Sequence, residues 1–308
     1  MSSDQLSLPW KASLHGGHSG QFCDHAEGSL REILEAAVRF GYQTFGVTEH
    51  VPRTDPQFLY PNEAALGWTV ETLAANFEGY SHTLSVLAEE FHGRLTVLRG
   101  FECEVVPHDG YLNEMRSHRA KRLPDGSLAF EYCVGSVHHV DGRQVDGPAE
   151  DFALAVRDIG GLEAFAVRYY ETLRDMVSEL KPEVVGHFDL VKRNVRLAGL
   201  DRACLDTNAV RHAALHALDV VREAGGILDL NTAGWRKGLG EPYPSPWLVQ
   251  QAHARGIGFC FGDDSHRVGD VGAGLYDAAT YLKYNGVGCI TVLTREGADL
   301  IHTKVDLP

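Results

Sequence analysis

The chain alternates between short apolar segments and helical patterns over most of its length. The apolar or β-branched segments are Thr44–Thr48, Leu95–Leu98, Val134–Val137, Val184–Val185, Ile227–Leu230, Gly258–Phe261 and Cys289–Leu293. Between them, apolar residues recur with the helical period over Leu30–Phe40, Val70–Phe91, Leu162–Leu180, Ala209–Ala224, Pro246–Ala254 and Ala278–Tyr284. Repeated strand–helix units predict parallel pairing, so we expect an α/β fold, either an open doubly wound sheet or a closed barrel.

The size and composition are those of one globular domain. The chain has 308 residues, of which 44% are hydrophobic and 23% charged, and α/β barrels commonly reach this length. No linker, low-complexity segment or repeat of fixed period divides it. Residues 1–308 are therefore expected to form a single domain.

The charge balance restricts the partners. With 42 acidic and 28 basic residues the net charge is −14, and such a chain is repelled by nucleic acid and anionic membranes. Any phosphate would need a local site of metal ions or a few basic side chains. Six scattered cysteines without a C-x-x-C pair indicate reduced thiols and a cytoplasmic protein. We see neither a membrane-spanning apolar stretch nor a signal-peptide pattern.

Polar residues lie at or just beyond the carboxyl ends of six of the predicted strands. They are Glu49-His50, Glu102-Cys103-Glu104, His138-His139, His187-Phe188-Asp189, Asn231-Thr232 and Asp263-Asp264-Ser265-His266. In barrel enzymes, strand ends and the loops after them form the active site. This recurrence favours a shared site over separate structural roles.

A further group of histidines lies near the amino terminus. His15, His18 and His25 fall within eleven residues, and Gly, Ser and Cys between them leave room around the imidazoles. Neutral imidazole and carboxylate suit Zn, Mn or Fe. The whole set is too large for one tetrahedral ion, so we expect two or three divalent metal ions, an arrangement that hydrolyses phosphoesters.

Together these motifs resemble the polymerase-and-histidinol-phosphatase (PHP) phosphoesterases. The resemblance rests on the His15–His25 region, Thr48-Glu49-His50, Gly100-Phe101-Glu102, Gly135-Ser136-Val137-His138, Gly186-His187-Phe188-Asp189-Leu190, Asn231-Thr232-Ala233-Gly234 and Asp264-Ser265-His266. It implies a distorted (β/α)7 barrel with a trinuclear metal centre. The segments Glu49–Arg53, Tyr60–Glu63 and Tyr243-Pro244 look most like the histidinol-phosphate phosphatases of that family.

The resemblance also implies how the ions are bound. One ion would take His15, His18, Glu102 and Asp264; a second would share Glu102 and add His138 and His187; the third would take His25, His50 and His266. The family usually places one residue between its first two histidines, whereas Gly16 and Gly17 separate His15 from His18, so that alignment on His18 puts Gly16 at the first ligand position. Side chains alternate along a strand, so we expect a bulge at the glycines to bring both imidazoles to one ion.

The implied activity is that of a phosphomonoesterase acting on a small substrate, L-histidinol phosphate, in histidine biosynthesis. Glu102 and Asp264 would act catalytically through the metals. Arg53, Arg193 and Arg236 follow strand ends and are candidates to bind the phosphate, although a solvated surface arginine is the alternative for each. The loop Arg53–Trp68 is expected to close over the substrate.

Two other functions stay open from the sequence. One is a phosphoesterase of the same fold acting on a nucleotide or sugar phosphate, and the other is a metal-binding regulatory module without turnover. The presence of Asp264 and His266 argues against the second. Glu104 is expected to support the ligands or to be structural, and His108, His118, His139 and His253 are expected in packing or surface roles.

Overall fold

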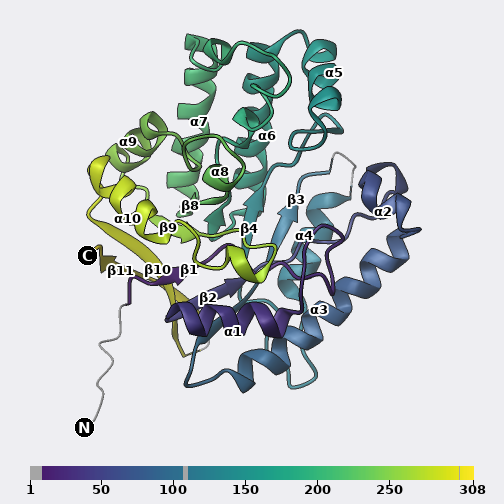
Figure 1. Ribbon diagram of the computed structural model, residues 1–308, viewed down its shortest axis with the longest axis vertical. Helices are drawn as coiled ribbons and strands as arrows, with labels where there is room; N and C mark the ends of the chain where they lie inside the picture. Colours follow the sequence, from purple (N-terminus) through teal and green to yellow (C-terminus); the bar gives the residue numbers. More distant parts are fainter. Residues whose placement is uncertain (1–8, 107–109, 298) are drawn as a thin grey trace.

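The computed structural model describes residues 9–106, 110–297 and 299–308, and its centre is a parallel sheet (Figure 1). Within these residues the sheet has seven strands in the order β1-β2-β3-β4-β7-β8-β9. They are β1 (Ala12–Ser13), β2 (Thr44–Val47), β3 (Thr96–Glu104), β4 (Tyr132–Ser136), β7 (Val184–Val185), β8 (Ile227–Asn231) and β9 (Phe259–Gly262). Every neighbouring pair is parallel, as strand–helix repeats require.

Contacts between the two edge strands nearly close the sheet into a barrel. The Leu14 N–H donates to the Phe261 carbonyl over 2.8 Å, and His15 forms a parallel bridge with Gly262. The (β/α)7 barrel is therefore confirmed, and the open sheet is excluded. Its distortion is clearest at β1 and β7, each only two residues long.

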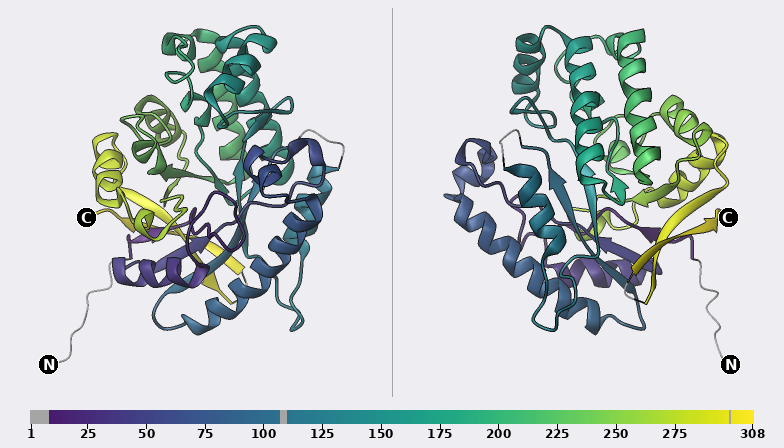
Figure 2. Two further views of the ribbon diagram at one scale, coloured as in Figure 1. Left: turned by 45° about the vertical axis from the view of Figure 1, so that its right-hand side comes forward. Right: turned by 180° about the vertical axis from the view of Figure 1, so that it is seen from behind.

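Helices cover the outside of the barrel (Figure 2). They are α1 (Leu30–Phe40), α2 (Pro61–Ala65), α3 (Val70–Glu90), α4 (Tyr111–Ala120), α5 (Ala149–Ile159), α6 (Leu162–Leu180), α7 (Asn208–Ala224), α8 (Ala233–Arg236), α9 (Pro246–Ala254) and α10 (Leu275–Tyr284). The six predicted helices are confirmed, with ends shifted by three residues at most. Helices α2, α4, α5 and α8 match no predicted segment. Of these, α2 and α8 have only five and four residues, and α4 is mostly polar, with Met115 its buried residue.

The start of α1 is set by its cap. The Ser29 side chain accepts from the Glu32 N–H while the Glu32 carboxylate accepts from the Ser29 N–H, a reciprocal capping box. Leu30, Ile33 and Leu34 then face the core. This cap fixes the point at which the histidine-rich segment ends.

The chain ends in an antiparallel hairpin. The segment Cys289–Leu293 lies in β10 (Cys289–Glu296), which pairs with β11 (Asp299–Asp306). Its prediction as one of the parallel strands is wrong, because β1 occupies the position beside β9. The hairpin instead packs Leu293 and Leu300 against side chains inside the barrel.

Apolar packing closes the amino-terminal end of the barrel. The interior cluster consists of Leu14, Leu98, Tyr132, Val134, Val184, Ile227, Cys260 and Leu293. The Tyr132 hydroxyl donates to the Leu14 carbonyl over 2.7 Å, and a Cβ on Gly46 would lie 1.9 Å from that hydroxyl, so glycine is required there. Only the carboxyl ends of the strands are thus left for a site.

Short 3₁₀ segments and one small hairpin shape the loops at that end. The 3₁₀ segments are Pro56–Phe58, Leu190–Lys192, Arg202–Leu205 and Val268–Asp270, and β5 (His139–Val140) pairs with β6 (Arg143–Gln144). None of the six cysteines is paired in a disulfide in this structure. No helix in the described part of the chain has the length and apolarity to cross a membrane.

Candidate metal centre

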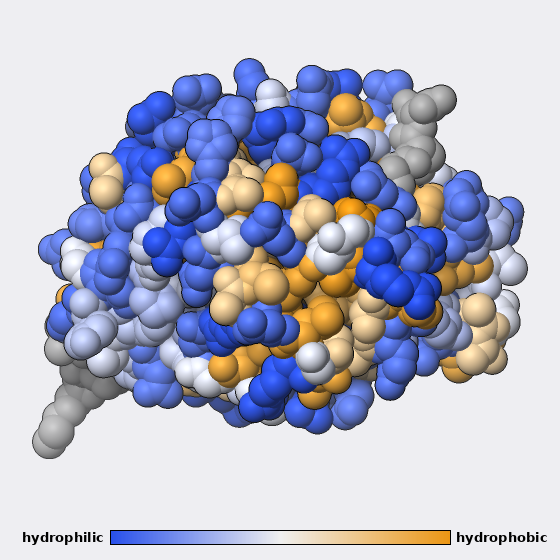
Figure 3. All heavy atoms as spheres, turned by 90° about the horizontal axis from the view of Figure 1, so that it is seen from above, coloured by the Kyte–Doolittle hydropathy of each residue, from blue (hydrophilic) through white to orange (hydrophobic). Residues whose placement is uncertain are grey.

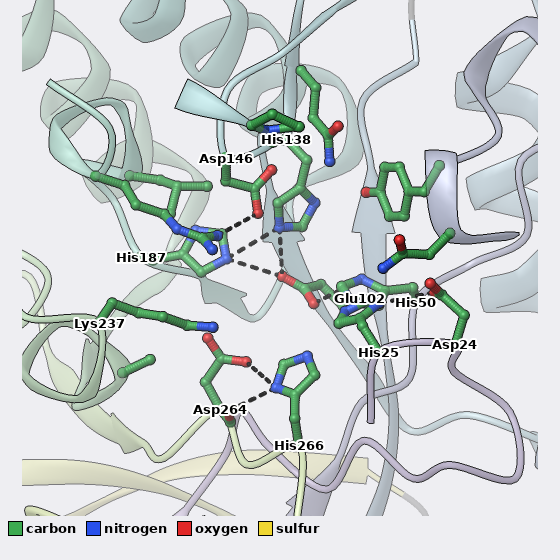
Figure 4. Close-up of a pocket in the computed structure, with 18 of the residues that line it drawn as sticks. Asp24, His25, His50, Glu102, His138, Asp146, His187, Lys237, Asp264 and His266 are labelled. Atoms are coloured by element: carbon green, nitrogen blue, oxygen red, sulfur yellow. Dashed lines mark hydrogen bonds and ion pairs between the residues drawn. The ribbon is translucent and has the colours of Figure 1, made fainter. Parts of the chain in front are cut away.

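Side chains from separate strand ends meet at the carboxyl end of the barrel (Figure 4). Glu102, near the end of β3, is the central one and is 1% exposed. Imidazole nitrogens of five histidines lie 3.1–3.7 Å from its oxygens: His15, His18, His50, His138 and His187. One carboxylate therefore contacts ligands predicted for all three ions.

The Gly16-Gly17 pair lets His15 and His18 reach the same carboxylate. Gly17 has a φ of +80°, a conformation that glycine adopts without strain. His15 Nε2 lies 3.3 Å from Glu102 Oε1, and His18 Nε2 lies 3.7 Å from Glu102 Oε2. The three side chains lie close enough to share one ion; their joint ligation stays a prediction.

The segment after β9 brings Asp264 and His266 to the cluster. Asp264 Oδ1 lies 3.7 Å from His18 Nε2, and Asp264 forms a further potential metal group with His15 and His187. Asp264 has a φ of +47° and His187 a φ of +22°. Such backbone conformations are uncommon outside glycine and concentrate at functional sites.

The remaining predicted ligands form a stack of rings. The ring centroids of His25 and His266 are 4.9 Å apart, and those of His25 and His50 are 5.5 Å apart. Cys23 Sγ belongs to the same group of potential ligands. The structure thus brings together the three histidines assigned to the third ion and adds a thiol.

An acceptor occupies Nδ1 of four imidazoles in the cluster. The pairs are Asp229 Oδ2 with His15 at 2.7 Å, Glu49 Oε2 with His18 at 3.2 Å, Asp24 Oδ1 with His25 at 2.9 Å, and the Asp264 carbonyl with His266 at 3.0 Å. An acceptor on Nδ1 fixes the tautomer that leaves Nε2 free to ligate, as is usual around metal-binding histidines.

Sequence reasoning missed Asp229, Glu49 and Asp24 in this role. Asp229 could have been noticed in the sequence, because it is an acidic residue in the middle of the apolar strand β8. In the structure it is completely buried. It also accepts the His187 N–H over 2.6 Å. Such an acid requires buried partners, but the sequence does not say which.

Glu104 lies behind the cluster. Its Oε1 is 3.3 Å from His50 Nδ1 and accepts from the Tyr60 hydroxyl, while its Oε2 accepts from Arg53 Nη1 over 2.9 Å. These contacts support the expectation that Glu104 orients a ligand.

Burial and neighbouring charges shift the pKa values of the carboxylates and imidazoles in the cluster. Burial raises the pKa of Glu102, but neighbouring imidazoles, His15 first among them, outweigh burial and hold that pKa well below its usual range. The pKa of Asp264 is also well below its usual range, because His15 and His266 outweigh burial. Burial lowers the pKa of His50 and His266 well below the usual value.

Burial also lowers the pKa of His15, His18 and His187, but neighbouring carboxylates, Glu102 and Glu49 among them, outweigh burial and raise it. Ionised carboxylates thus meet neutral His50 and His266, whereas His15, His18 and His187 must release a proton when a metal ion binds.

The donor set fits divalent metal ions. His15 Nε2 and His18 Nε2 are buried and have no hydrogen-bond partner among the described residues, and such atoms are rare unless a ligand or water satisfies them. Within each group the donor atoms lie within 4.8 Å of one another. Imidazole and carboxylate donors suit Zn, Mn and Fe.

A cavity of about 350 Å³ opens beside the cluster. Arg193 and Lys237 bring positive charge to its wall, and Arg193 Nη1 pairs with Asp146 Oδ2 at 2.9 Å. Figure 4 shows Lys237 extending toward Asp264 on the side of the cavity away from Asp24. The volume lies near the lower end of small-molecule sites, roughly 300–1,000 Å³.

The predicted loop Arg53–Trp68 contributes Tyr60, Pro61 and Asn62 to this wall. Arg53 itself is buried outside the wall, where it stacks on Tyr60 and pairs with Glu104 and Glu63. These contacts hold the loop against the barrel. Substrate binding by Arg53 stays a prediction that its position does not favour.

Arg236 is likewise turned away from the cavity. It donates to the backbone carbonyls of Asp263 and Asp264 and to the Thr232 hydroxyl. Its contacts stabilise the strand end that carries a predicted ligand. Of the three arginines predicted to bind phosphate, Arg193 is the one on the cavity wall within the described residues.

The histidines predicted to lie outside the centre are mostly accounted for. His118 packs against Phe77 and Phe101, and His139 is buried beside Tyr60. His253 is exposed. His108 lies outside the described residues.

Comparison with known proteins agrees with this geometry. The family model described as "PHP domain" matches residues 15–233. The probable histidinol-phosphatase of Deinococcus radiodurans is 34% identical over 274 residues, covering 89% of this chain and 94% of that protein. The histidinol-phosphatase of Saccharomyces cerevisiae is 30% identical over 295 residues, covering 85% of each.

A solved structure shares the fold. Histidinol phosphate phosphatase from Lactococcus lactis subsp. lactis, in complex with zinc, L-histidinol and phosphate, matches with a TM-score of 0.64. The match covers 95% of this chain and 99% of that chain at 18% identity.

Proposed function

The chain belongs to the PHP domain family, and from this premise we propose that it is a metal-dependent phosphomonoesterase that hydrolyses L-histidinol phosphate to L-histidinol and phosphate. The observation that carries the proposal is the cluster around Glu102, in which buried carboxylates pair with Nδ1 of His15 and His18. Glu102 itself and its neighbours His50, His138 and His187 line a small cavity. Relatives named histidinol-phosphatase align over 85–90% of the chain and indicate the substrate.

The cluster uses divalent metal, and we propose two or three ions of Zn, Mn or Fe. One would bind His15, His18, Glu102 and Asp264; one would share Glu102 and add His138 and His187; one would bind His25, His50 and His266. When bound, such ions activate water and neutralise phosphate charge. The chain's own part is to fix the ligands through Asp229, Glu49 and Asp24.

The remaining groups of the cavity suit this substrate. Arg193 and Lys237 can hold phosphate oxygens that the metals leave free. Asp146 lines the cavity, and its Oδ1 has no hydrogen-bond partner among the described residues; this acceptor suits the substrate's ammonium or imidazole. A cavity of about 350 Å³ favours a small ester over a nucleotide. We propose that the enzyme acts in the cytoplasm, within histidine biosynthesis.

The test is a panel of phosphate esters on metal-reconstituted protein. L-histidinol phosphate, a nucleoside monophosphate, a sugar phosphate and p-nitrophenyl phosphate are compared by phosphate release with Zn, Mn or Fe. We expect the highest kcat/KM for L-histidinol phosphate. A preference for nucleotides or sugar phosphates would overturn the substrate, and no turnover at full metal content would indicate a regulatory module.

A further inference from the structure

A cysteine thiol lies among the ligands assigned to the third ion. Cys23 Sγ and one ligand atom from each of His25, His50 and His266 all lie within 4.8 Å of one another. Cys23 Sγ is 3.3 Å from His25 Nδ1 and 3.5 Å from His25 Nε2. Two ligands of one tetrahedral zinc ion, with Zn–S near 2.3 Å and Zn–N near 2.05 Å, are about 3.6 Å apart. The thiol is therefore placed at ligand distance from its neighbour.

The backbone fixes this position. The Phe22 and Cys23 N–H groups both donate to the Ser19 carbonyl, at 3.1 and 3.0 Å. The Ser19 N–H and hydroxyl in turn donate to Glu49 Oε1, at 2.7 and 3.1 Å. Cys23 is 7% exposed, so its sulfur is held in the cluster by a tight turn tied to a buried carboxylate.

On this geometry we propose that Cys23, as a thiolate, is the fourth protein ligand of the ion bound by His25, His50 and His266. The inference rests on the metal centre of the proposed function. As the metal–sulfur bond forms, the thiol proton passes to solvent and a water ligand leaves the ion. The third position is then a Cys-His₃ site, whereas the donors assigned to the other two ions are imidazole and carboxylate.

A separate observation indicates a bound ligand beside Cys23 and His25. The Asp24 side chain is 2% exposed, and its Oδ2 has no hydrogen-bond partner in the described part of the chain. Its Oδ1 fixes Nδ1 of His25, which leaves His25 Nε2 for an ion. The group with Cys23 is also the one potential metal group that contains a cysteine among the described residues.

The donor chemistry has a consequence for the choice of metal. Thiolate is a soft ligand that favours zinc or cobalt over manganese, which prefers oxygen donors. The third position should therefore retain zinc or cobalt when manganese occupies the other two. The thiol also makes this position the one most sensitive to oxidation.

Cobalt absorption spectroscopy tests the assignment without substrate. The metal-free protein is titrated with Co²⁺, and a sulfur-to-cobalt charge-transfer band in the near ultraviolet is followed to saturation. We expect the band in the unaltered protein, its loss in Cys23→Ser, and its retention in Cys204→Ser, a matched change outside the potential metal groups. Cobalt affinity at that position should fall in Cys23→Ser by at least the roughly 10–100-fold typical of lost outer-shell partners.

X-ray absorption spectroscopy of the unaltered, zinc-loaded protein tests the same assignment without any substitution. A sulfur scatterer near 2.3 Å from zinc is expected. Absence of sulfur scattering at full zinc occupancy, or a cobalt band that persists in folded Cys23→Ser, would overturn the proposal. Either result would leave hydrolysis of L-histidinol phosphate standing, because that activity is measured separately on the unaltered enzyme.

Discussion

Glu102 illustrates how one residue can control the whole centre. Its two oxygens contact five imidazoles, so its charge acts on every predicted ion. We expect Glu102→Gln to lose at least one bound ion per chain and to abolish turnover while the circular dichroism spectrum is kept. Metal content by mass spectrometry and phosphate release provide the two readouts.

Glu104→Gln is the matched control, two residues along the same strand. Because Glu104 supports His50 and Arg53 from behind, its loss should cost roughly 10–100-fold in activity. Equal losses from the two substitutions would mean that the wrong carboxylate has been assigned as the shared ligand.

Asp229 acts through the imidazole that it holds. With its Oδ2 2.7 Å from His15 Nδ1, Asp229→Asn should weaken the orientation and basicity of His15. We expect metal affinity to fall roughly 10–100-fold, measured by competition with a chromophoric chelator. Asp219→Asn, at a half-buried position of α7 that pairs with Arg255 and lies outside the potential metal groups, should leave the affinity unchanged; a shared decrease would point to a general loss of stability.

Arg193 is the arginine whose position suits the phosphate. Arg193→Ala should lower kcat/KM for L-histidinol phosphate by roughly 10²-fold, about 2.7 kcal/mol of transition-state binding, with metal content unchanged. Steady-state kinetics give the value, and the exposed Arg196→Ala is the control. Unchanged kcat/KM in Arg193→Ala would remove it from the substrate site.

Residue types after strand ends made most of the centre predictable. His138, His187 and Asp264 could be proposed because each lies two residues beyond the end of an apolar strand. The carboxylates behind the imidazoles could not, since Asp229 meets His15 across 214 residues of sequence and only the closed barrel joins them. Arg53 is the opposite case. Its position after a strand end predicted that it binds phosphate, but in the structure its charge is neutralised by the buried carboxylates of Glu63 and Glu104.

At the scale of elements, the C-terminal hairpin stabilises the barrel from the end opposite the site. Arg295 in β10 pairs with Glu131 at 2.6 Å and donates to the Val97 carbonyl of β3. Glu131 also accepts from the Arg99 N–H over 3.0 Å. This one carboxylate therefore joins the hairpin to the sheet just before β4.

The stability from Glu131 should depend on pH. Burial raises the pKa of Glu131, but the hydrogen bonds from Arg295 and Arg99 outweigh burial and lower it. A lowered folded pKa stabilises the protein above the unfolded value, near 4.3, and this contribution is lost as pH falls through the folded pKa.

We therefore expect Glu131→Gln to reduce the unfolding free energy by about 1–3 kcal/mol at pH 7, with the difference shrinking below about pH 4. Urea unfolding of both metal-free proteins at each pH measures it. A difference independent of pH would show that packing, not charge, anchors the hairpin.

Periodicity predicted which segments are strands and helices but not every partner. Apolar character made Cys289–Leu293 a strand, yet its antiparallel pairing depends on β1 having taken the place beside β9. The strand β1 is only two residues long, too short for periodicity to reveal. The sequence thus predicted seven parallel strands, but it included Cys289–Leu293 in place of β1.

In the whole molecule, the residues that stabilise the fold and those of the candidate metal centre lie at opposite ends of the barrel. Apolar side chains and the hairpin fill one end, and the ionisable cluster occupies the other. Seen from above, the outer surface is mostly hydrophilic around a central group of apolar residues (Figure 3), in keeping with a net charge of −14. We propose that the chain unfolds as the single domain that its sequence predicts.

Removal of metal should test both the centre and the single domain. Ions that bind only the folded chain stabilise it by about 4 kcal/mol each when present at 1,000 times Kd. At about 2–4 °C per kcal/mol for domains of 150–250 residues, chelation should lower the unfolding midpoint by at least about 5 °C, with one calorimetric transition before and after.

The control is the same chelation of Glu102→Gln, where the shift should be smaller because fewer ions are bound. Two transitions would divide the chain into separate domains. An unchanged midpoint would mean that the histidine–carboxylate cluster binds metal too weakly to contribute to the fold, because a tightly bound ion must raise the free energy of unfolding.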